Sequence, residues 1–282
     1  MCGIFASNDP LIRQRHEKII SYHLNFRGPD YNSGLINFAN WKLYHSRLSI
    51  IAPDKKYNQP YLCEDGSILL YNGEIFNFKN LAKKLTSKKI ISDTELLSKI
   101  IVKKKFNPNL LDGFFAAVRI SKEGVLLNCL RDPFGVKPLF YFKRKKYISI
   151  TSEASIIKKI FNLKFSSESI KEFKFFRSPI FTTSYYKNVK AVSPGHCLIN
   201  KKYFDPLEEM KVKKNKKKNN LNNLLKKIIT KRQVSDVPVA ILLSSGIDSN
   251  LIKFMSPNIS NYFSGGLKND NEIQYLKKKY IN

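Results

Sequence analysis

The sequence predicts an α+β layered domain followed by the start of a parallel, doubly wound α/β unit. Strand-like segments interleave with amphipathic helices as far as residue 151, which is typical of layered α+β domains. A basic, low-complexity segment at 211–223 then marks a change of composition. Beyond it, an unbroken apolar segment at 237–243 leads into a Ser/Gly loop and a helix, a pattern typical of parallel sheets.

Helix and strand signals in the first part follow one another closely. Residues 11–26 are amphipathic and predict a helix, which the turn residues Arg27-Gly28-Pro29-Asp30 end. A short helix is predicted at 77–87, and the capping box Ser92-Asp93-Thr94-Glu95 begins another. The strands are predicted at 41–51, 67–76, 114–120, 125–130, 138–142 and 147–151.

The second part contains too few elements for a complete sheet. A helix at 221–232 precedes the strand at 237–243, and a further strand at 261–263 precedes a helix at 270–281. We therefore expect a first domain over residues 2–200, a basic linker over 201–220 and an incomplete second domain over 221–282.

Composition limits the class of protein. The chain has 282 residues and a formal net charge of +28, but its lysines are spread among many Asn and Ile residues. We expect a general compositional bias and not a nucleic-acid-binding stripe. No apolar segment in the sequence is long enough to span a membrane, and we expect no signal peptide. Cys2, Cys63, Cys129 and Cys197 lack metal-ligand spacing, so we expect neither zinc nor a disulfide framework, and a cytoplasmic location.

The position of Cys2 is chemically informative. Removal of Met1 would leave a thiol and a free α-amine on one residue, which are a nucleophile and a base. An α-amine has an ordinary pKa of about 7.7–8.0, so part of it is unprotonated near neutral pH. Taken alone, a cysteine near the start of a chain can also arise by chance.

Six motifs occur together in one order and give Cys2 its significance. They are Cys2-Gly3-Ile4-Phe5, Arg27-Gly28-Pro29-Asp30, Arg47-Leu48-Ser49-Ile50, Tyr71-Asn72-Gly73-Glu74-Ile75-Phe76-Asn77, Ser92-Asp93-Thr94-Glu95 and Arg131-Asp132-Pro133-Phe134-Gly135. Over roughly residues 1–200 the chain resembles the glutaminase domain of class II glutamine amidotransferases. The resemblance implies an N-terminal-nucleophile αββα sandwich and no cofactor for the glutaminase reaction.

The resemblance also implies roles for single residues. Cys2 would attack the carboxamide of glutamine, while the Asn72 side-chain amide and the Gly73 N–H would form the oxyanion hole. Arg47 would bind the substrate carboxylate, and Asp93 with Glu74 its ammonium group. Leu48, Ser49, Ile50 and Ile51 would line the same pocket.

Each assignment has a structural alternative. Asn72-Gly73 is also the sequence of a type I′ hairpin turn, and Arg47 could be a charge at the edge of a strand. Asp93 could serve only to stabilise the start of a helix. We interpret the Arg27 and Arg131 motifs as structural turns without a part in catalysis.

The Ser/Gly loop resembles the ATP-pyrophosphatase loop of glutamine-hydrolysing asparagine synthetases. The resemblance implies that ATP, with Mg²⁺ nearby, binds at Leu243, Ser244, Ser245, Gly246, Asp248, Ser249 and Gly265. Ser245 stands where the family has a glycine, which would cost on the order of 1 kcal/mol if that position needs a positive φ. The alternative is an ordinary serine-capped helix. We predict no protein-only metal site.

These features predict a glutamine amidotransferase of the asparagine-synthetase type, with glutamine, aspartate and ATP as substrates. Its partner would be a complementing synthetase chain or a second copy. Three other hypotheses stay open: a different amide acceptor such as a sugar or another carboxylate, a non-catalytic fragment that binds or regulates a partner, and a basic nucleic-acid-binding protein.

Overall fold

The computed structural model describes residues 1–85, 90–212, 220–267 and 271–280. The chain divides into two compact units, Met1–Lys214 and Asn215–Asn282. Within the described residues, no helix has both the length and the apolar character that crossing a membrane requires.

The first unit contains a seven-stranded antiparallel sheet. The strand order is β11-β9-β10-β1-β4-β2, and β3 also pairs with β4. β1 lies near the centre, between β10 and β4, with Phe5 opposite Thr151 and Tyr44. The strands are β1 (Gly3–Ser7), β2 (Tyr31–Asn32), β3 (Ile36–Phe38), β4 (Trp41–Arg47), β9 (Phe140–Arg144), β10 (Tyr147–Thr151) and β11 (Val189–Ala191).

A second antiparallel sheet of the first unit has the order β5-β6-β7-β8. Its long central pair runs in register from Ile68 opposite Ile120 to Ile75 opposite Gly113. The strands are β5 (Tyr61–Leu62), β6 (Ile68–Ile75), β7 (Gly113–Ile120) and β8 (Leu126–Arg131).

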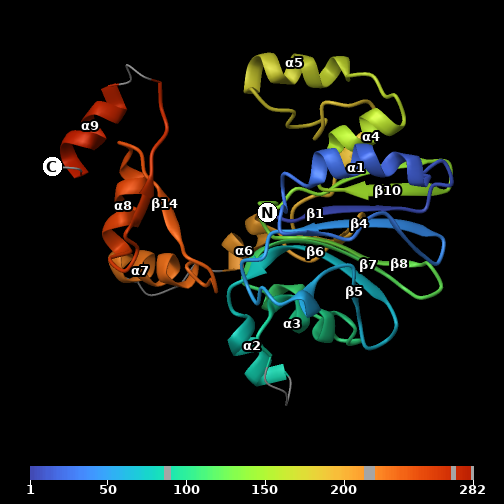
Figure 1. The fold of residues 1–282 in the computed structure, drawn as a ribbon, viewed down its shortest axis with the longest axis horizontal. Coiled ribbons are helices and arrows are strands. Elements are labelled where there is room, and N and C mark those ends of the chain that lie inside the picture. The colour runs from blue at the N-terminus through green and yellow to red at the C-terminus, as the bar shows by residue number, and fades with distance from the viewer. Residues whose placement is uncertain (86–89, 213–219, 268–270, 281–282) are drawn as a thin grey trace. The chain divides into compact units, whose positions relative to one another are not determined.

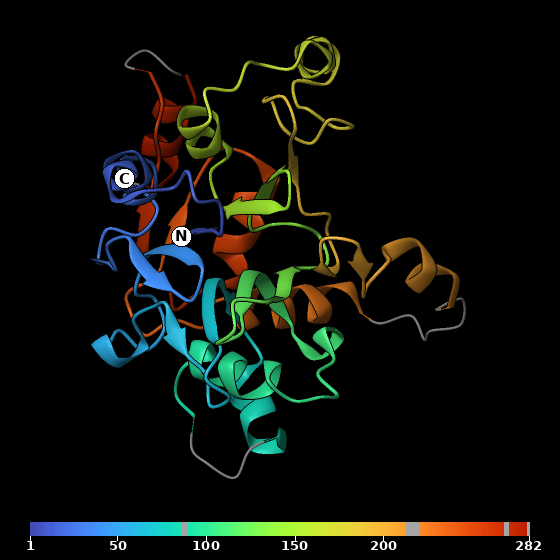
Figure 2. The ribbon, with the colours of Figure 1, turned by 90° about the vertical axis from the view of Figure 1, so that its right-hand side faces the viewer.

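Helices cover the outer face of each sheet, which gives four layers (Figure 1). α1 (Glu17–Leu24) and α4 (Ala154–Ile160) pack against the seven-stranded sheet. α2 (Phe78–Leu85) and α3 (Asp93–Ile101) lie on the other side, where α3 contacts β6. Figure 2 shows the same separation after a 90° turn. The predicted αββα sandwich is confirmed.

Alternating side chains build the core between the two sheets. Ile4 and Ala6 of β1 face this core, while Phe5 faces a second core formed with α1 and α4. Ile68 and Leu70 of β6 meet them from the other sheet. The same alternation continues into the polar residues at the ends of these strands. Those residues lie together at one edge of the sandwich, where they line a pocket.

Several predicted elements need correction. The helix predicted at 11–26 is shorter, since a 3-10 turn at Gln14–His16 precedes α1. The strand predicted at 41–51 ends at Arg47, and residues 48–51 form a loop beside the pocket described below. The strand predicted at 237–243 is only β14 (Ala240–Leu242). β1 was not predicted, because a strand buried on both faces shows no polar–apolar alternation.

The first residues of the linker expected at 201–220 form regular structure. β13 (Lys201–Lys202) pairs with β12 (His196–Leu198), and the Tyr203 hydroxyl donates to the carbonyl of Arg131 at 2.9 Å. α6 (Pro206–Val212) follows within the first unit. Residues 213–219 of the expected linker lie outside the described residues.

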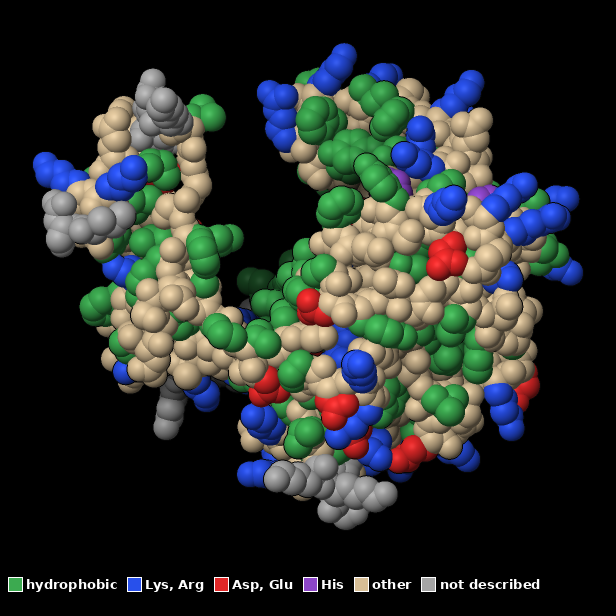
Figure 3. Space-filling model, in the orientation of Figure 1, with side chains coloured by type: hydrophobic (Ala, Val, Ile, Leu, Met, Phe, Trp, Pro, Cys, Tyr) green, Lys and Arg blue, Asp and Glu red, His purple; other side chains and the backbone are tan. Residues whose placement is uncertain are grey.

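α5 (Ser167–Phe176) carries exposed apolar side chains, including Phe173, Phe175 and Phe176. These gather with others in one area over α5 (Figure 3). On the face that Figure 3 shows, Lys and Arg side chains are spread over the surface and form no single stripe.

The second unit pairs two parallel strands, β14 and β15 (Asn261–Phe263), with Ile241 opposite Tyr262. Its helices are α7 (Leu221–Lys231), α8 (Ile247–Met255) and α9 (Asn271–Tyr280). The alternation of strands and helices confirms the start of a doubly wound α/β unit.

Candidate active site around Cys2

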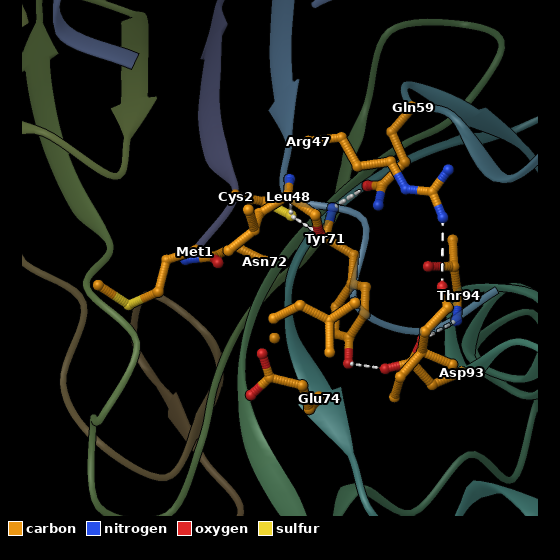
Figure 4. A pocket seen from close by; sticks show the side chains of 13 residues that line it. Met1, Cys2, Arg47, Leu48, Gln59, Tyr71, Asn72, Glu74, Asp93 and Thr94 are labelled. Carbon is orange, nitrogen blue, oxygen red and sulfur yellow. Dashed lines mark hydrogen bonds between the residues drawn. The ribbon is translucent and has the colours of Figure 1, made fainter. Parts of the chain in front are cut away.

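A pocket opens at the polar edge of the sandwich (Figure 4). It draws on the start of β1, the end of β4 with its following loop, β6 and the start of α3. The lining residues are Met1, Cys2, Arg47, Leu48, Ile50, Ile51, Gln59, Tyr71, Asn72, Gly73, Glu74, Asp93 and Thr94. Of the predicted glutamine-site residues, Ser49 is the one outside this lining.

The Cys2 thiol lines the pocket and contacts the loop that follows β4. Its Sγ accepts a hydrogen bond from the Leu48 N–H at 3.4 Å and lies 3.8 Å from the Leu48 carbonyl oxygen. Burial raises the pKa of the thiol, although the contact with Leu48 opposes this shift. The thiol is therefore protonated at neutral pH, and attack on a substrate requires a base that takes this proton.

The Arg27-Gly28-Pro29-Asp30 turn makes hydrogen bonds to Cys2 and to the loop beside it. Arg27 donates from Nε to the Cys2 carbonyl at 3.0 Å and pairs with Glu153 at 2.7 Å. Asp30 accepts the Ser49 N–H at 2.7 Å and so fixes the loop that carries Leu48. A Cβ on Gly28 would lie 2.5 Å from the Ser46 carbonyl, so only glycine allows this close approach to β4.

Asn72 and Gly73 lie within β6, opposite Ala116 and Phe115 of β7. The hairpin-turn alternative is therefore wrong. A Cβ on Gly73 would overlap the Phe114 carbonyl, which explains the glycine by close packing between strands. The Asn72 side chain is fully buried, and among the described residues neither its Nδ2 nor its Oδ1 has a hydrogen-bond partner. A buried amide without partners indicates a group that a ligand completes.

Arg47 is only 4% exposed, so the alternative of a surface charge is wrong. Nη1 donates to the Asp54 carbonyl at 2.9 Å and to the Asn58 side chain at 3.0 Å. Nη2 donates to the carbonyls of Ile51 at 3.3 Å and Ala52 at 2.6 Å. The guanidinium thus holds the loop at 51–58 in place beside the pocket.

Asp93 combines a capping position with a place in the pocket wall. Ser92 caps α3, and Asp93 is its first residue, which confirms the predicted helix start. Its Oδ2 accepts the Tyr71 hydroxyl at 2.8 Å and the Ile75 N–H at 3.2 Å. Burial raises the pKa of Asp93 to about 6, and these two hydrogen bonds only partly offset it. Asp93 is thus a buried carboxylate that a cation could neutralise.

Four residues of the pocket lining, Met1, Gln59, Tyr71 and Thr94, were not predicted as site residues, and neither was Lys137 beside it. Tyr71 holds Asp93, and Gln59 holds Tyr71 by accepting its N–H through Oε1 at 2.5 Å. Lys137 pairs with Glu74 at 3.3 Å. Tyr71 and Lys137 stand inside quoted motifs or next to them, so their positions were visible in the sequence. Their side-chain directions depend on the strand register and on the turn before β9.

The predicted nucleotide loop lies between β14 and α8 in the second unit. Leu243 donates its N–H to the Phe263 carbonyl at 2.8 Å, which joins the loop to β15. The Ser244 and Ser249 hydroxyls lie 2.9 Å apart, and Gly246 is the N-cap of α8. Gly265 and Asp248 are exposed. Among the described residues with positive φ, Ser245 does not appear, so the expected backbone strain does not arise.

A carboxylate occupies part of this loop. Glu272 of α9 accepts both the Ser245 N–H at 2.6 Å and the Ser245 hydroxyl at 2.7 Å. The loop thus presents donors suited to an anion, and the hydroxyl of Ser245 adds one that glycine would lack. Within the described residues, no group of three or more His, Cys, Asp or Glu side chains could hold a metal ion.

Comparison with known families decides the class of the chain. Residues 1–209 match the family model of the glutamine amidotransferase domain. The chain belongs to the glutamine amidotransferase family. Residues 220–278 match a second family model, asparagine synthase.

Known relatives of this glutamine amidotransferase include glutamine-hydrolysing asparagine synthetases. The nodule enzyme of Pisum sativum is 29% identical over 265 residues, which cover 89% of this chain and 41% of the relative. Asparagine synthetase 1 of Bacillus subtilis (strain 168) is 28% identical over 280 residues, which cover 92% and 43%. The chain therefore spans less than half the length of these two relatives. A solved glutamine phosphoribosylpyrophosphate amidotransferase from B. subtilis aligns with a TM-score of 0.48 at 14% identity, covering 100% of this chain and 71% of that one.

Proposed function

We propose that the first unit hydrolyses glutamine to glutamate and ammonia, with Cys2 as the nucleophile. The observation that carries the proposal is the buried amide of Asn72, which has no hydrogen-bond partner among the described residues and lies in the same pocket as the Cys2 thiol. Removal of Met1 would convert the amine of Cys2 into the base of the reaction. Burial already lowers the pKa of the present α-amine on Met1, so this site disfavours a charged amine.

The reaction would proceed in two stages. The Cys2 sulfur forms a bond to the carboxamide carbon while its proton passes to the Cys2 α-amine. The Asn72 amide and the Gly73 N–H donate to the resulting oxyanion. The C–N bond then breaks, and the proton leaves with ammonia. Water attacks the thioester with the α-amine again as base, which releases glutamate and restores the thiol.

Glutamine would be oriented by charges at the pocket wall. Its α-ammonium group would meet the acidic side chains of the pocket wall, Glu74 on the side of Cys2 and Asp93 on the other. The positive charge of Arg47, whose Nη atoms already donate to the loop at 51–58, would attract its carboxylate. Leu48, Ile50 and Ile51 line the pocket and would contact the aliphatic part of the substrate. Ser49 would act through its main chain, which Asp30 holds.

The second half of the proposal concerns the fate of the ammonia. The asparagine synthase match and the names of the relatives support ATP-dependent amidation of aspartate to asparagine. Leu243, Ser244, Ser245, Gly246, Asp248, Ser249 and Gly265 would hold the nucleotide. ATP would supply an activated leaving group for the β-carboxylate of aspartate, with Mg²⁺ to neutralise its phosphates. The matched 220–278 region would need the rest of a synthetase domain, from a complementing chain or a longer protein.

The test is glutamate release from glutamine by the purified chain, with mass spectrometry to verify loss of Met1. We expect activity that Cys2→Ala abolishes. Cys197→Ala is the matched control, because Cys197 lies outside the lining of the pocket, and it should keep the activity. A processed chain without Cys2-dependent glutamate release would disprove the proposed glutaminase.

A further inference from the structure

Lys137 is a buried cation that the proposed mechanism does not use. It lies in the turn between β8 and β9, and its side chain is 7% exposed. Its main-chain N–H donates to Asp132 Oδ2 at 3.0 Å, and its main-chain carbonyl accepts the Arg131 Nε–H at 3.0 Å. The Arg131-Asp132-Pro133-Phe134-Gly135 motif thus fixes the main chain from which Lys137 projects.

The ammonium group of Lys137 pairs with Glu74, a residue of the pocket lining. Its Nζ lies 3.3 Å from Glu74 Oε2, and the Glu74 side chain is 19% exposed. Glu74 lines the pocket two residues after Asn72 on β6. In Figure 4 the Glu74 carboxylate lies on the side of Cys2 and Met1, away from Asp93. Lys137 is not part of the lining, and its ion pair with Glu74 is the contact that joins it to the pocket.

The charge of Glu74 is unfavourable for its neighbours unless something balances it. Its negative charge adds to the burial that raises the pKa values of Cys2 and Asp93. A buried ion pair contributes little net stability, because the desolvation penalty offsets the Coulomb gain. Breaking such a pair leaves an uncompensated buried charge, which is costly. A pair of this kind beside a binding pocket is therefore better explained by positioning than by stability.

We propose that Lys137 is a positioning residue of the glutamine site. Its ammonium fixes Glu74 Oε2 and balances its charge, so that the carboxylate receives the α-ammonium of glutamine at a set position. A carboxylate held through one oxygen can still accept hydrogen bonds on the other. This inference rests on the proposed glutaminase function, and it assigns a role in substrate binding to a motif otherwise interpreted as a turn.

The experiment measures glutamine binding and turnover in four variants of the full chain: Lys137→Met, Lys137→Arg, Glu74→Gln and the double variant Lys137→Met/Glu74→Gln. We expect Lys137→Met to raise KM for glutamine by about tenfold or more while kcat changes by less than about threefold, as for truncation of one partner in a buried charge pair. Lys137→Arg keeps the positive charge beside Glu74 and should leave KM within about threefold of wild type. In the Glu74→Gln background, Lys137→Met should add less than about twofold.

Binding is also measured by calorimetry in the Cys2→Ala background, where glutamine is not consumed. Absence of glutamine binding in Cys2→Ala would overturn the proposed function itself. Binding that Lys137→Met leaves unchanged, or weakens equally with and without Glu74, would overturn the role of Lys137 alone. If Lys137→Met does not fold, Glu74→Gln carries the test, because a KM within about threefold of wild type in this variant would overturn the role of the pair.

Arg144→Met is the matched control for loss of an ion pair. Arg144 pairs with the buried Asp9 at 2.6 Å, and both residues lie outside the lining of the pocket. We expect this variant to keep the wild-type KM even if its melting temperature falls. An equal rise of KM in Arg144→Met would assign the effect of Lys137→Met to general destabilisation.

Discussion

Asn72 and Glu74 continue, on β6, the face that Ile68 and Leu70 present to the inter-sheet core. On β4, His45 and Arg47 likewise continue the face of Trp41 and Leu43. The same alternation that builds an apolar core therefore delivers polar groups where the core ends. Those buried polar groups cost free energy unless a partner satisfies them.

Asn72→Ala tests the oxyanion role directly. We expect kcat for glutamate release to fall by about 10² to 10³, as for loss of one oxyanion-hole donor, with KM within about threefold of wild type. The melting temperature should change little, because the amide has no hydrogen-bond partner among the described residues to lose. Steady-state kinetics and thermal unfolding measure both effects. A kcat close to wild type would exclude Asn72 as the donor.

Asp93 predicts a pH dependence of glutamine binding. Burial raises its pKa to about 6, so the carboxyl is ionised at pH 7.5 and increasingly neutral below pH 6. A neutral carboxyl no longer attracts the substrate ammonium, and KM should rise about tenfold per pH unit well below pH 6. KM measured from pH 5 to 8 tests this. In Asp93→Asn, KM should be high at every pH and lose this dependence.

The same shift has the opposite sign for stability. The folded state binds the Asp93 proton more tightly than the unfolded chain, in which the carboxyl has its ordinary pKa of 3.8. The free energy of unfolding therefore falls as the pH rises from about 4 to 6. We expect Asp93→Asn to have a higher melting temperature than the wild type at pH 8, and this difference should be smaller at pH 4.5. A lower melting temperature of Asp93→Asn at pH 8 would mean that the carboxylate stabilises the fold.

At the scale of elements, loops at strand ends carry both candidate sites. The loop after β4 contacts the thiol through Leu48, and the loop after β14 begins α8. The sequence predicts that β4 continues to residue 51, because the apolar residues 50 and 51 continue its strand-like composition. These side chains instead line the pocket, and Arg47 turns back to hold the carbonyls of the loop.

Glu272 should compete with phosphate at the second loop. Because its carboxylate already accepts both donors of Ser245, an anion that uses them must displace it. We expect Glu272→Gln to bind Mg²⁺–pyrophosphate about tenfold more tightly, since a charge-assisted pair is replaced by weaker neutral hydrogen bonds. Calorimetry with Glu168→Gln on α5 as control measures this. Equal affinities of wild type and Glu272→Gln would show that the contact does not compete.

At the scale of the whole molecule, the two units differ in how much core they bury. The first has cores on both faces of the seven-stranded sheet. The buried apolar side chains in the described part of the second are Ile241, Leu243, Ile259 and Leu276, while Leu242, Ile247 and Phe254 are more than 80% exposed. Burial of apolar surface is the main stabilising contribution, so the second unit should be the less stable one.

We therefore expect two unfolding transitions, with the second unit unfolding at the lower temperature. In the Cys2→Ala background, glutamine should raise the temperature of the upper transition only. At a concentration 100 times its dissociation constant, it should add about 2.7 kcal/mol to the free energy of unfolding of the first unit. Differential scanning calorimetry, with limited proteolysis to assign the fragments, measures this. A single transition would show that the two units unfold cooperatively.

The sequence by itself determined the family and most of the elements. Ordered motifs around Cys2, Asn72 and Asp93 identified the family, and the Ser92 capping box placed the start of α3, because these signals are local along the chain. Only the tertiary structure decided that Asn72-Gly73 lies within a strand, that Arg47 is buried, and that Lys137 meets Glu74. Those facts depend on strand register and on contacts between residues far apart in sequence, which no local pattern encodes.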